Sequence, residues 1–429
     1  MEVRIEKLVY GGDGLAHHDG HTVFVPLVLP GELVQIESAA RKKKFIRGKL
    51  ERVVEPSADR VTAPCPYHGR CGGCQYQHMP YEAQLRYKAE ILRETLGRIG
   101  RIQWAGAIET HASPPFGYRN RAQWKLRANQ EGATGNAGIG YFEMGSTKLI
   151  DVSECPVLSP RLAETFSMLR EFVTRGKILA SVDEIEAFVD SSDEKILLNL
   201  SADRLSGTPE TIAAALRLSI PQIESIFIQD RRADKLHLLG PGFLAYQTGG
   251  ASYRVGHLSF FQVNRFLVEP LVEAAIGKER GRLALDLYAG VGLFSVALAK
   301  QFERVIGVES NPAAAKDLET NLEQSGGASL SARDVTAEAF LARWHDTPDL
   351  VIVDPPRAGI EPGALEHLKR VAPARIHYIS CDPATLARDL AQLVGTNGAG
   401  PYEIDSMNLF DIFPQTYHME VLVRLRRRA

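Results

Sequence analysis

The sequence predicts a multidomain α/β protein built from three consecutive segments. Residues 1–57 form short, partly alternating β-prone runs separated by glycine turns, a pattern typical of a small β-barrel. Residues 58–258 mix helical and strand patterns and contain four cysteines, which favours an α+β domain that holds a metal centre. Residues 259–429 alternate strand and helix from Arg282 onward, and this alternation predicts a doubly wound parallel sheet.

Composition places the chain among ordinary globular proteins. Hydrophobic residues make up 45% of the sequence and charged residues 24%. No run approaches the ~18 apolar residues of a membrane helix, and residues 1–14 lack a signal-peptide core. Five cysteines in 429 residues do not make a disulfide framework. We therefore expect a cytoplasmic protein without membrane contact. Because the net charge is -2, any affinity for RNA must come from local basic patches.

The first segment has a barrel-like pattern that ends in a dense basic run. Its β-prone runs cover residues 3–8, 21–25 and 32–36, and Arg41–Lys49 brings many cations and one aromatic residue together. Small barrels commonly bind nucleic acid through basic loops and aromatic platforms. The run is therefore a candidate for phosphate binding, although a solvated charged face is the alternative. The segment resembles a TRAM domain, an oligonucleotide-binding (OB)-like barrel found on RNA-modifying enzymes.

Four cysteines form a pattern suited to a metal centre. Cys65, Cys71 and Cys74 lie close together, and Cys155 follows far along the chain. Three clustered thiols and one distant thiol complete a tetrahedral set, which suits either an iron–sulfur cluster or zinc. Four unligated cysteines are the remaining alternative. The spacing differs from that of radical S-adenosylmethionine enzymes.

The rest of the central segment carries structural patterns and one row of cations. Apolar residues between 81 and 99 recur at helical spacing, which indicates core packing. Residues 118–127 alternate basic and other side chains on a predicted strand, so they face either RNA phosphates or water. Further helices are predicted at 161–174 and 209–217, and further strands at 138–142, 148–152, 185–189, 195–200 and 225–229.

The third segment begins with the pattern of a nucleoside site. A strand at 283–287 leads into a glycine turn containing Gly290, and a second strand ends at Glu309, where a ribose diol would be held. The turn lacks the third glycine of a dinucleotide site, so a single nucleoside suits it better than a pyrophosphate. Two further strands end at Asp334 and Asp354.

Cys381 occupies the junction between a strand and a helix. Residues 376–380 are apolar and β-prone, Asp382 is placed to cap a helix, and Pro383 stands at its first position. Ligands bind at this edge of open α/β sheets, and the partial positive charge of a helix start lowers the pKa of a thiol. Cys381 is therefore a candidate nucleophile; a small buried cysteine at a tight turn is the alternative.

Five motifs give the third segment a specific resemblance. They are Ser259–Asn264, Asp286–Gly290, Asp354–Arg357, Ser380–Pro383 and Phe413–Glu420. In this order they resemble the motif series of the RNA uridine-5-methyltransferases, which have the Rossmann-like class I fold of enzymes that use S-adenosylmethionine. Together with the barrel and the cysteines, the resemblance covers nearly the whole chain. It is closest to members acting on 23S ribosomal RNA, because the tRNA-specific bacterial members lack both the barrel and the cluster.

The resemblance implies a role for each matching residue. Cys381 is expected to be the nucleophile and Glu420 the general base. The four cysteines are expected to hold a structural 4Fe-4S cluster. Leu293 departs from the asparagine found in some members, and Asp334 matches only by its place after a strand. Contacts to S-adenosylmethionine are expected from Gln262, Tyr288, Gly290, Glu309, Asp334 and Asp354.

The chemistry of C5 methylation makes the same demand on the chain. Uracil C5 is a poor nucleophile until a thiolate adds at C6, and this covalent catalysis divides one difficult step into easier ones. A base must then remove the C5 proton so that the cysteine can leave. The target uridine must also be splayed out of its stack. Glu420 begins an apolar terminal run, where a carboxylate is costly unless functional; a glutamate facing water on an edge strand is the alternative.

We therefore expect an enzyme that methylates uridine C5 in 23S ribosomal RNA. Within the same chemistry, a tRNA uridine or an RNA cytosine C5 is the alternative substrate. A different class of protein is a non-catalytic iron–sulfur RNA-binding protein with a relic methyltransferase fold. We expect RNA as the partner, no DNA, and a monomer.

Overall fold

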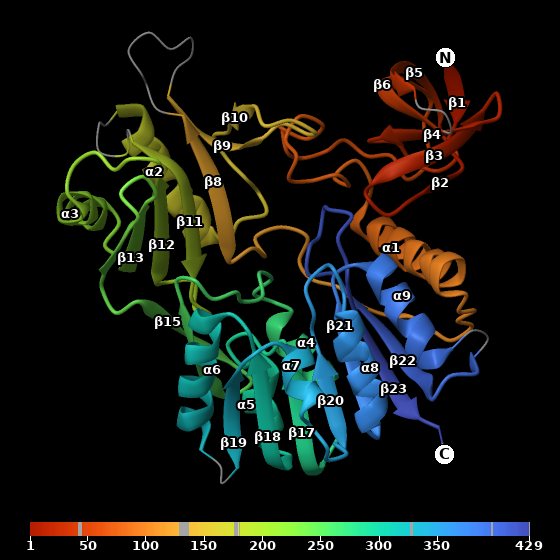
Figure 1. The fold of residues 1–429 in the computed structure, drawn as a ribbon. Helices are drawn as coiled ribbons and strands as arrows, with labels where there is room; N and C mark the ends of the chain where they lie inside the picture. The colour runs from red at the N-terminus through yellow and green to blue at the C-terminus, as the bar shows by residue number, and fades with distance from the viewer. Residues whose placement is uncertain are drawn as a thin grey trace.

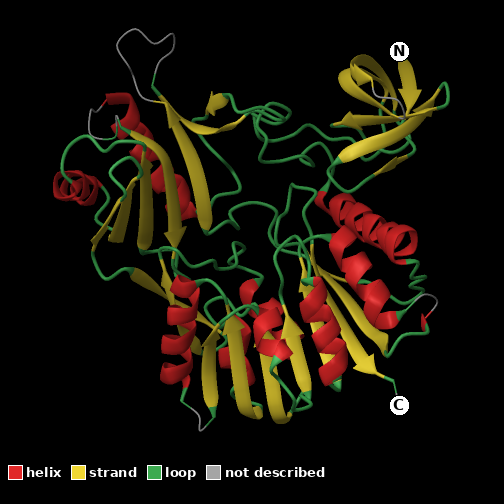
Figure 2. Cartoon of the chain, viewed as in Figure 1, coloured by secondary structure: helices red, strands yellow, loops and turns green. Residues whose placement is uncertain are grey.

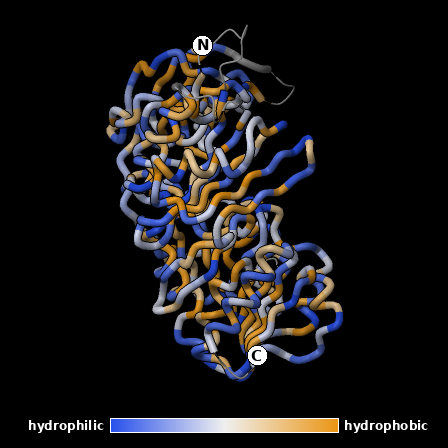
Figure 3. Tube along the Cα trace, turned by 90° about the vertical axis from the view of Figure 1, so that its left-hand side faces the viewer, coloured by the Kyte–Doolittle hydropathy of each residue, from blue (hydrophilic) through white to orange (hydrophobic). Residues whose placement is uncertain are grey.

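The computed structural model contains three main β-sheets that follow one another along the chain (Figure 1). It describes residues 1–41, 45–127, 137–175, 179, 181–326, 329–395 and 398–428. Hydrophobic residues run along the strands through the interior of the molecule (Figure 3). Within these residues, no helix is long and apolar enough to cross a membrane.

The N-terminal sheet is a curled six-stranded sheet, in agreement with the predicted barrel-like segment. Its strand order is β1-β5-β6-β4-β3-β2, and alternate residues of β3 and β4 face a small apolar core of its own. Lys42–Lys44 of the basic run lie outside the described residues. The strands are β1 (Glu2–Arg4), β2 (Lys7–Leu8), β3 (Asp13–His18), β4 (His21–Pro26), β5 (Leu33–Arg41) and β6 (Phe45–Glu55).

The central sheet has seven strands in the order β10-β9-β8-β11-β12-β13-β14. Helices α2 (Pro160–Arg175) and α3 (Pro209–Ser219) contribute apolar residues to the core on one of its faces. The strands are β8 (Arg121–Arg127), β9 (Gly138–Phe142), β10 (Leu149–Asp151), β11 (Val182–Val189), β12 (Ile196–Ala202), β13 (Ile223–Asp230) and β14 (Lys235–Leu239).

The predicted row of cations on β8 is neutralised by the neighbouring strand. Arg121 lies 3.7 Å from Glu186 and stacks on the ring of Phe188, while Lys125 pairs with Glu184. These contacts follow from the antiparallel register of β8 and β11. They favour a role in joining the two strands, so RNA contact by β8 stays a prediction.

The C-terminal sheet has eight strands in the order β19-β18-β17-β20-β21-β23-β22-β7. The strands from β17 to β21 are parallel, and β23 inserts antiparallel between β21 and β22. The sheet is therefore doubly wound, as predicted. Its strands are β7 (Glu109–His111), β17 (Gly281–Leu287), β18 (Phe302–Glu309), β19 (Leu330–Asp334), β20 (Leu350–Val353), β21 (Arg375–Ser380), β22 (Tyr402–Phe410) and β23 (Glu420–Arg427).

Helices cover both faces of the C-terminal sheet (Figure 2). One face packs against α1, α7, α8 and α9, and the other against α4, α5, α6 and the hairpin β15–β16. The elements are α1 (Tyr81–Thr95), the π-helix η1 (Leu96–Gly100), α4 (Val268–Ile276), α5 (Leu293–Leu298), α6 (Pro312–Ser325), α7 (Ala337–Ala342), α8 (Pro362–Val371), α9 (Pro383–Val394), β15 (Phe243–Thr248) and β16 (Ala251–Gly256).

Parts of the predicted central segment join the C-terminal sheet. Strand β7 pairs with β22, α1 packs beside α9, and the hairpin β15–β16 belongs to the same core as α4 and α5. The periodicity of α1 showed that it had an apolar face, but not which sheet that face would cover. The division into domains at 1–57, 58–258 and 259–429 stays a prediction.

Candidate active site and cysteine pocket

The strand order brings the two predicted catalytic residues to one edge of the C-terminal sheet. Cys381 follows the last residue of β21, and Glu420 is the first residue of β23. The two strands are antiparallel, with Ser380 paired to Val421. One step further along this register, Cys381 stands opposite Glu420. Residues far apart in the sequence are therefore neighbours at the carboxyl edge of the parallel strands.

The turn after β21 has the predicted helix cap. Asp382 accepts hydrogen bonds from the backbone N–H groups of Ala384 and Thr385, at 2.9 and 3.0 Å. Pro383 then occupies the first helical position of α9, where a missing N–H has no cost. This cap fixes where the strand ends and the helix begins, and so fixes the backbone of Cys381.

The expectation of a lowered thiol pKa is wrong for Cys381 in this structure. Burial raises the pKa of the Cys381 thiol to about 12, and the nearby carboxyl groups of Glu420 and Asp354 raise it further, against the opposing charge of Arg357. Desolvation and like charge outweigh the helix start. In this state the thiol is protonated at neutral pH, and forming the thiolate requires a change in its surroundings.

Glu420 and Asp354 also hold their protons more tightly than usual. Glu420 is 5% exposed, and its burial together with Asp354 raises its pKa well above the ordinary value. Burial and the carboxyl of Asp286 raise the pKa of Asp354 to about 7. Since β23 is an interior strand, the alternative of a water-facing edge glutamate is wrong for Glu420. A raised pKa makes Glu420 a stronger base once it is ionised.

The predicted methyl-donor residues line the same edge, at the ends of β17, β18 and β19. Gly290, with φ of +55°, donates its N–H to Glu309 at 2.9 Å. A Cβ added to Gly290 would meet no atom within 4 Å, so open space adjoins this turn. Asp334 is paired with Glu309 in the sheet register. Tyr288, which has a left-handed backbone, donates its hydroxyl hydrogen bond to Glu361.

Gln262 and Leu293 lie slightly apart from this row. Gln262 is 6% exposed, and its backbone carbonyl accepts a hydrogen bond from Asn120 at 3.1 Å. Leu293 begins α5, is buried, and accepts a hydrogen bond from Tyr253 through its backbone carbonyl. The segment that carries Gln262 precedes α4, outside the strand ends.

Two residues with the features of site residues were not singled out from the sequence. Asp286 is fully buried on β17; burial raises its pKa to about 7, and its Oδ1 atom has no hydrogen-bond partner among the described residues. Arg357 is the cation whose charge acts on both Cys381 and Glu420. A charged residue inside an apolar run, and an arginine directly after Asp354-Pro355-Pro356, were the available signals.

The loop that leads to Glu420 is held from several sides. Asp411 forms a fully buried ion pair with Lys88 of α1, at 2.6 Å. Gln415, with φ of +70°, exchanges amide hydrogen bonds with Gln84. Its carbonyl also accepts the backbone N–H groups of Gln75 and Tyr76, both at 2.9 Å. The segment directly after Cys74 therefore contacts the approach to Glu420.

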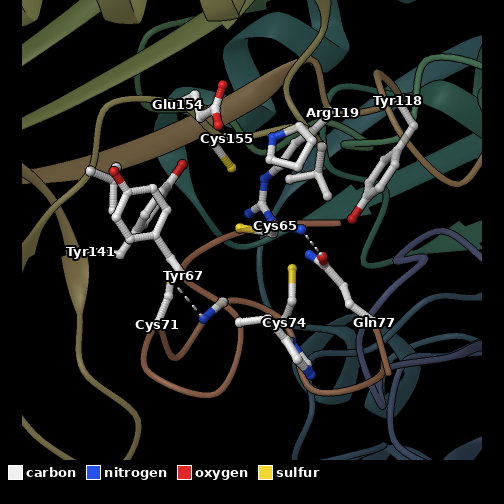
Figure 4. Close-up of a pocket in the computed structure, with 15 residues that line it drawn as sticks. Cys65, Tyr67, Cys71, Cys74, Gln77, Tyr118, Arg119, Tyr141, Glu154 and Cys155 are labelled. Atoms are coloured by element: carbon white, nitrogen blue, oxygen red, sulfur yellow. Dashed lines mark hydrogen bonds between the residues drawn. The ribbon is translucent and has the colours of Figure 1, made fainter. Parts of the chain in front are cut away.

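The four cysteines of the pattern line one pocket (Figure 4). All are free thiols, and burial raises the pKa of Cys74 to about 12. The charges of Cys65 and Cys155 act on Cys71, so the thiols lie near one another. Within the described ranges, however, no group of three or more His, Cys, Asp or Glu residues is arranged to hold a metal ion as it stands.

Comparison with known proteins identifies the chain in two steps. The sheet order and the row of polar residues at its carboxyl edge define a class I methyltransferase fold. Residues 80–428 match the model of the tRNA (uracil-5-)-methyltransferase family. The chain belongs to this family of RNA (uracil-5-)-methyltransferases.

Individual relatives span almost the entire chain. An uncharacterized RNA methyltransferase of Aquifex aeolicus is 33% identical over 99% of this chain and 98% of its own length. The 23S rRNA (uracil(1939)-C(5))-methyltransferase RlmD of Shewanella amazonensis is 31% identical over 98% of this chain and 94% of its own. The solved structure of Pyrococcus abyssi tRNA (uracil-54, C5)-methyltransferase in complex with S-adenosyl-L-homocysteine superposes with a TM-score of 0.75 and 27% identity, covering 99% and 100% of the two chains.

Proposed function

We propose that this protein transfers a methyl group from S-adenosylmethionine to C5 of a uridine in RNA through a covalent bond between Cys381 and C6. The observation that carries the proposal is the register of β21 and β23, which puts a thiol and a buried carboxyl opposite each other. They stand at the edge that also carries the nucleoside-type turn. Family membership speaks against the non-catalytic alternative.

The residues of the chain divide the reaction between them. Cys381, as thiolate, bonds to C6 and pushes ring electron density onto C5 and O4. S-adenosylmethionine, when bound, supplies an electrophilic methyl group to C5. Glu420, ionised, takes the C5 proton; the C5–H electrons restore the C5–C6 double bond, and the thiolate leaves. Arg357 favours the ionised forms of both groups.

A set of residues at the strand ends would hold the methyl donor. The open space beside Gly290 suits a nucleoside, and the carboxylate of Glu309 suits the ribose hydroxyls. Asp286, with its unpartnered Oδ1, stands next to this turn and belongs with the set. Support comes from the similar Pyrococcus abyssi enzyme, which was solved with S-adenosyl-L-homocysteine. The remaining members of the set are Gln262, Tyr288, Asp334 and Asp354.

The substrate we propose is 23S ribosomal RNA, with a tRNA uridine as the alternative. The Shewanella amazonensis relative acts on 23S rRNA, whereas the Pyrococcus abyssi relative acts on tRNA. We expect 23S RNA from a strain lacking the gene to lose one 5-methyluridine, and purified protein to restore it. Nucleoside mass spectrometry of separated RNAs measures this. A loss confined to tRNA would move the proposal to the alternative, and new 5-methylcytidine would move it to cytosine.

We also propose that Cys65, Cys71, Cys74 and Cys155 hold a 4Fe-4S cluster. Four free thiols around one buried pocket fit this group, because four thiolates in an apolar site require cationic metal. Closing the set requires the side chains to rotate inward. The backbone N–H of Gly73 points to the sulfur of Cys71 at 3.4 Å, and such hydrogen bonds stabilise cluster thiolates. Bound, the cluster would cross-link distant segments; zinc is the alternative.

The N-terminal sheet, proposed to be a TRAM domain, is expected to bind RNA phosphates through its basic run. Replacing Arg41, Lys42, Lys43 and Lys44 by glutamine should weaken RNA binding and flatten its salt dependence, since each lost phosphate contact removes about one released counterion. Affinity for S-adenosylmethionine should stay unchanged. Titration at several salt concentrations measures both. An unaltered RNA affinity and salt slope would make the run a solvated face.

A further inference from the structure

A tyrosine of the N-terminal sheet reaches the backbone of the candidate nucleophile. Tyr10 stands in the turn between β2 and β3, which is closed by a hydrogen bond from Val9 N–H to the carbonyl of Asp13 at 2.9 Å. Its hydroxyl donates to the backbone carbonyl of Cys381 at 3.2 Å. The two residues are 371 positions apart in the chain. A contact of this kind forms only if the sheet is docked on the catalytic edge.

The same turn packs on the loop that leads to Glu420. The ring of Tyr10 meets the ring of Tyr417 edge-on, with centroids 5.4 Å apart at 89°. Gly12, whose φ is +91°, approaches so closely that a Cβ would stand 3.4 Å from Tyr417 and 3.2 Å from Gln75. One turn of the N-terminal sheet therefore touches the segments carrying both candidate catalytic residues.

The docking of this turn is anchored by buried and charged contacts. Leu8 and Leu29 of the N-terminal sheet belong to the same apolar core as Tyr76 and Tyr378 of the C-terminal part. Lys7 forms an ion pair with Glu94 of α1 at 2.7 Å. Figure 1 shows β2 beside α1. Because burial raises the pKa of Tyr10, its hydroxyl keeps the proton that it donates.

We propose that Tyr10 is a positioning residue for the reaction, which holds the Cys381 backbone through the carbonyl and thereby makes the N-terminal sheet part of the active site. The proposal rests on the proposed function of Cys381. The carbonyl of Cys381 stands before the helix cap, outside the hydrogen-bond ladder of α9, so a donor from another segment can set its orientation. The side-chain direction of Cys381 follows from that orientation.

The variant Tyr10→Phe separates positioning from RNA grip. It keeps the ring against Tyr417 and removes one hydrogen bond, so kcat should fall roughly fivefold while KM for RNA and affinity for S-adenosylmethionine stay unchanged. Tyr87→Phe is the matched control: it removes a tyrosine hydroxyl that donates to Asp59 at 3.0 Å, and kcat should not change. Thermal unfolding of each variant, compared with the parent, detects loss of folding.

A second readout follows formation of the bond to RNA. In a Glu420→Gln background, Tyr10→Phe should slow the appearance of the protein–RNA adduct by the same factor. A raised KM with unchanged kcat would overturn the proposal and leave Tyr10 as an RNA contact. Unchanged kcat and KM would overturn it as well. Absence of any adduct in Glu420→Gln with Tyr10 intact would contradict the proposed function instead, and the kcat and KM of Tyr10→Phe still test positioning.

Discussion

Replacing Cys381 by alanine should abolish methylation and adduct formation, whereas Glu420→Gln should form the adduct and then stop. Without the thiol, C5 of uracil stays a poor nucleophile, so neither a covalent species nor product forms. With glutamine at 420 the thiol adds and the methyl group is transferred, but no base removes the C5 proton. Turnover should fall roughly 10²–10⁴-fold, the usual contribution of a general base.

A denaturing gel with RNA and methyl-labelled S-adenosylmethionine measures this difference. We expect a slowly migrating, labelled, nuclease-sensitive band for Glu420→Gln and none for Cys381→Ala or the double variant. A labelled band in Cys381→Ala would exclude it as the nucleophile, and turnover at the parent rate by Glu420→Gln would leave that residue a structural role. Because the pKa of Cys381 is raised to about 12, the adduct should form faster as pH rises from 6 to 9.

Removal of one proposed cluster ligand should have the second large effect. Protein prepared without oxygen should be brown and contain about four iron and four sulfide per chain, the content of a cubane cluster. Cys71→Ser should bleach it and lower the temperature of unfolding, since metal binding contributes to folding free energy. Iron and sulfide analysis with absorption spectra and thermal unfolding measure these changes.

Two comparisons make the cluster experiment specific. Cys381→Ser, which changes the cysteine outside the pocket, should keep full colour and iron content. Stoichiometric zinc without iron in anaerobically prepared protein would contradict the cubane assignment. Because Gln75 and Tyr76 hold the carbonyl of Gln415, loss of the cluster should also weaken methylation.

Local patterns of the sequence predicted much of the fold because the elements carry their own signals. The alternation from Arg282 onward gave the parallel sheet, and Asp382 with Pro383 gave the start of α9. Sheet membership of α1 and β7 was missed, since periodicity describes a face and not its partner.

Charge at the site was predicted less well than position. The helix start at Cys381 suggested a lower thiol pKa, but desolvation and the carboxyls of Glu420 and Asp354, brought in by distant strands, raise it. In the same way, the cations of β8 were visible in the sequence, whereas their partners Glu184 and Glu186 depend on strand pairing. Tyr10 carried no signal at all, because its role arises only from docking of the N-terminal sheet.

The central claim is substitution at C5 of uridine, and tritium release tests it most directly. RNA transcribed with [5-³H]uridine is incubated with the protein and S-adenosylmethionine, and tritium in water is compared with methyl groups incorporated. The account predicts one tritium released for each methyl group transferred, and no release with Cys381→Ala. RNA carrying [5-³H]cytidine instead should release none. Methyl transfer without tritium release from uridine would place the methyl group elsewhere and contradict the account.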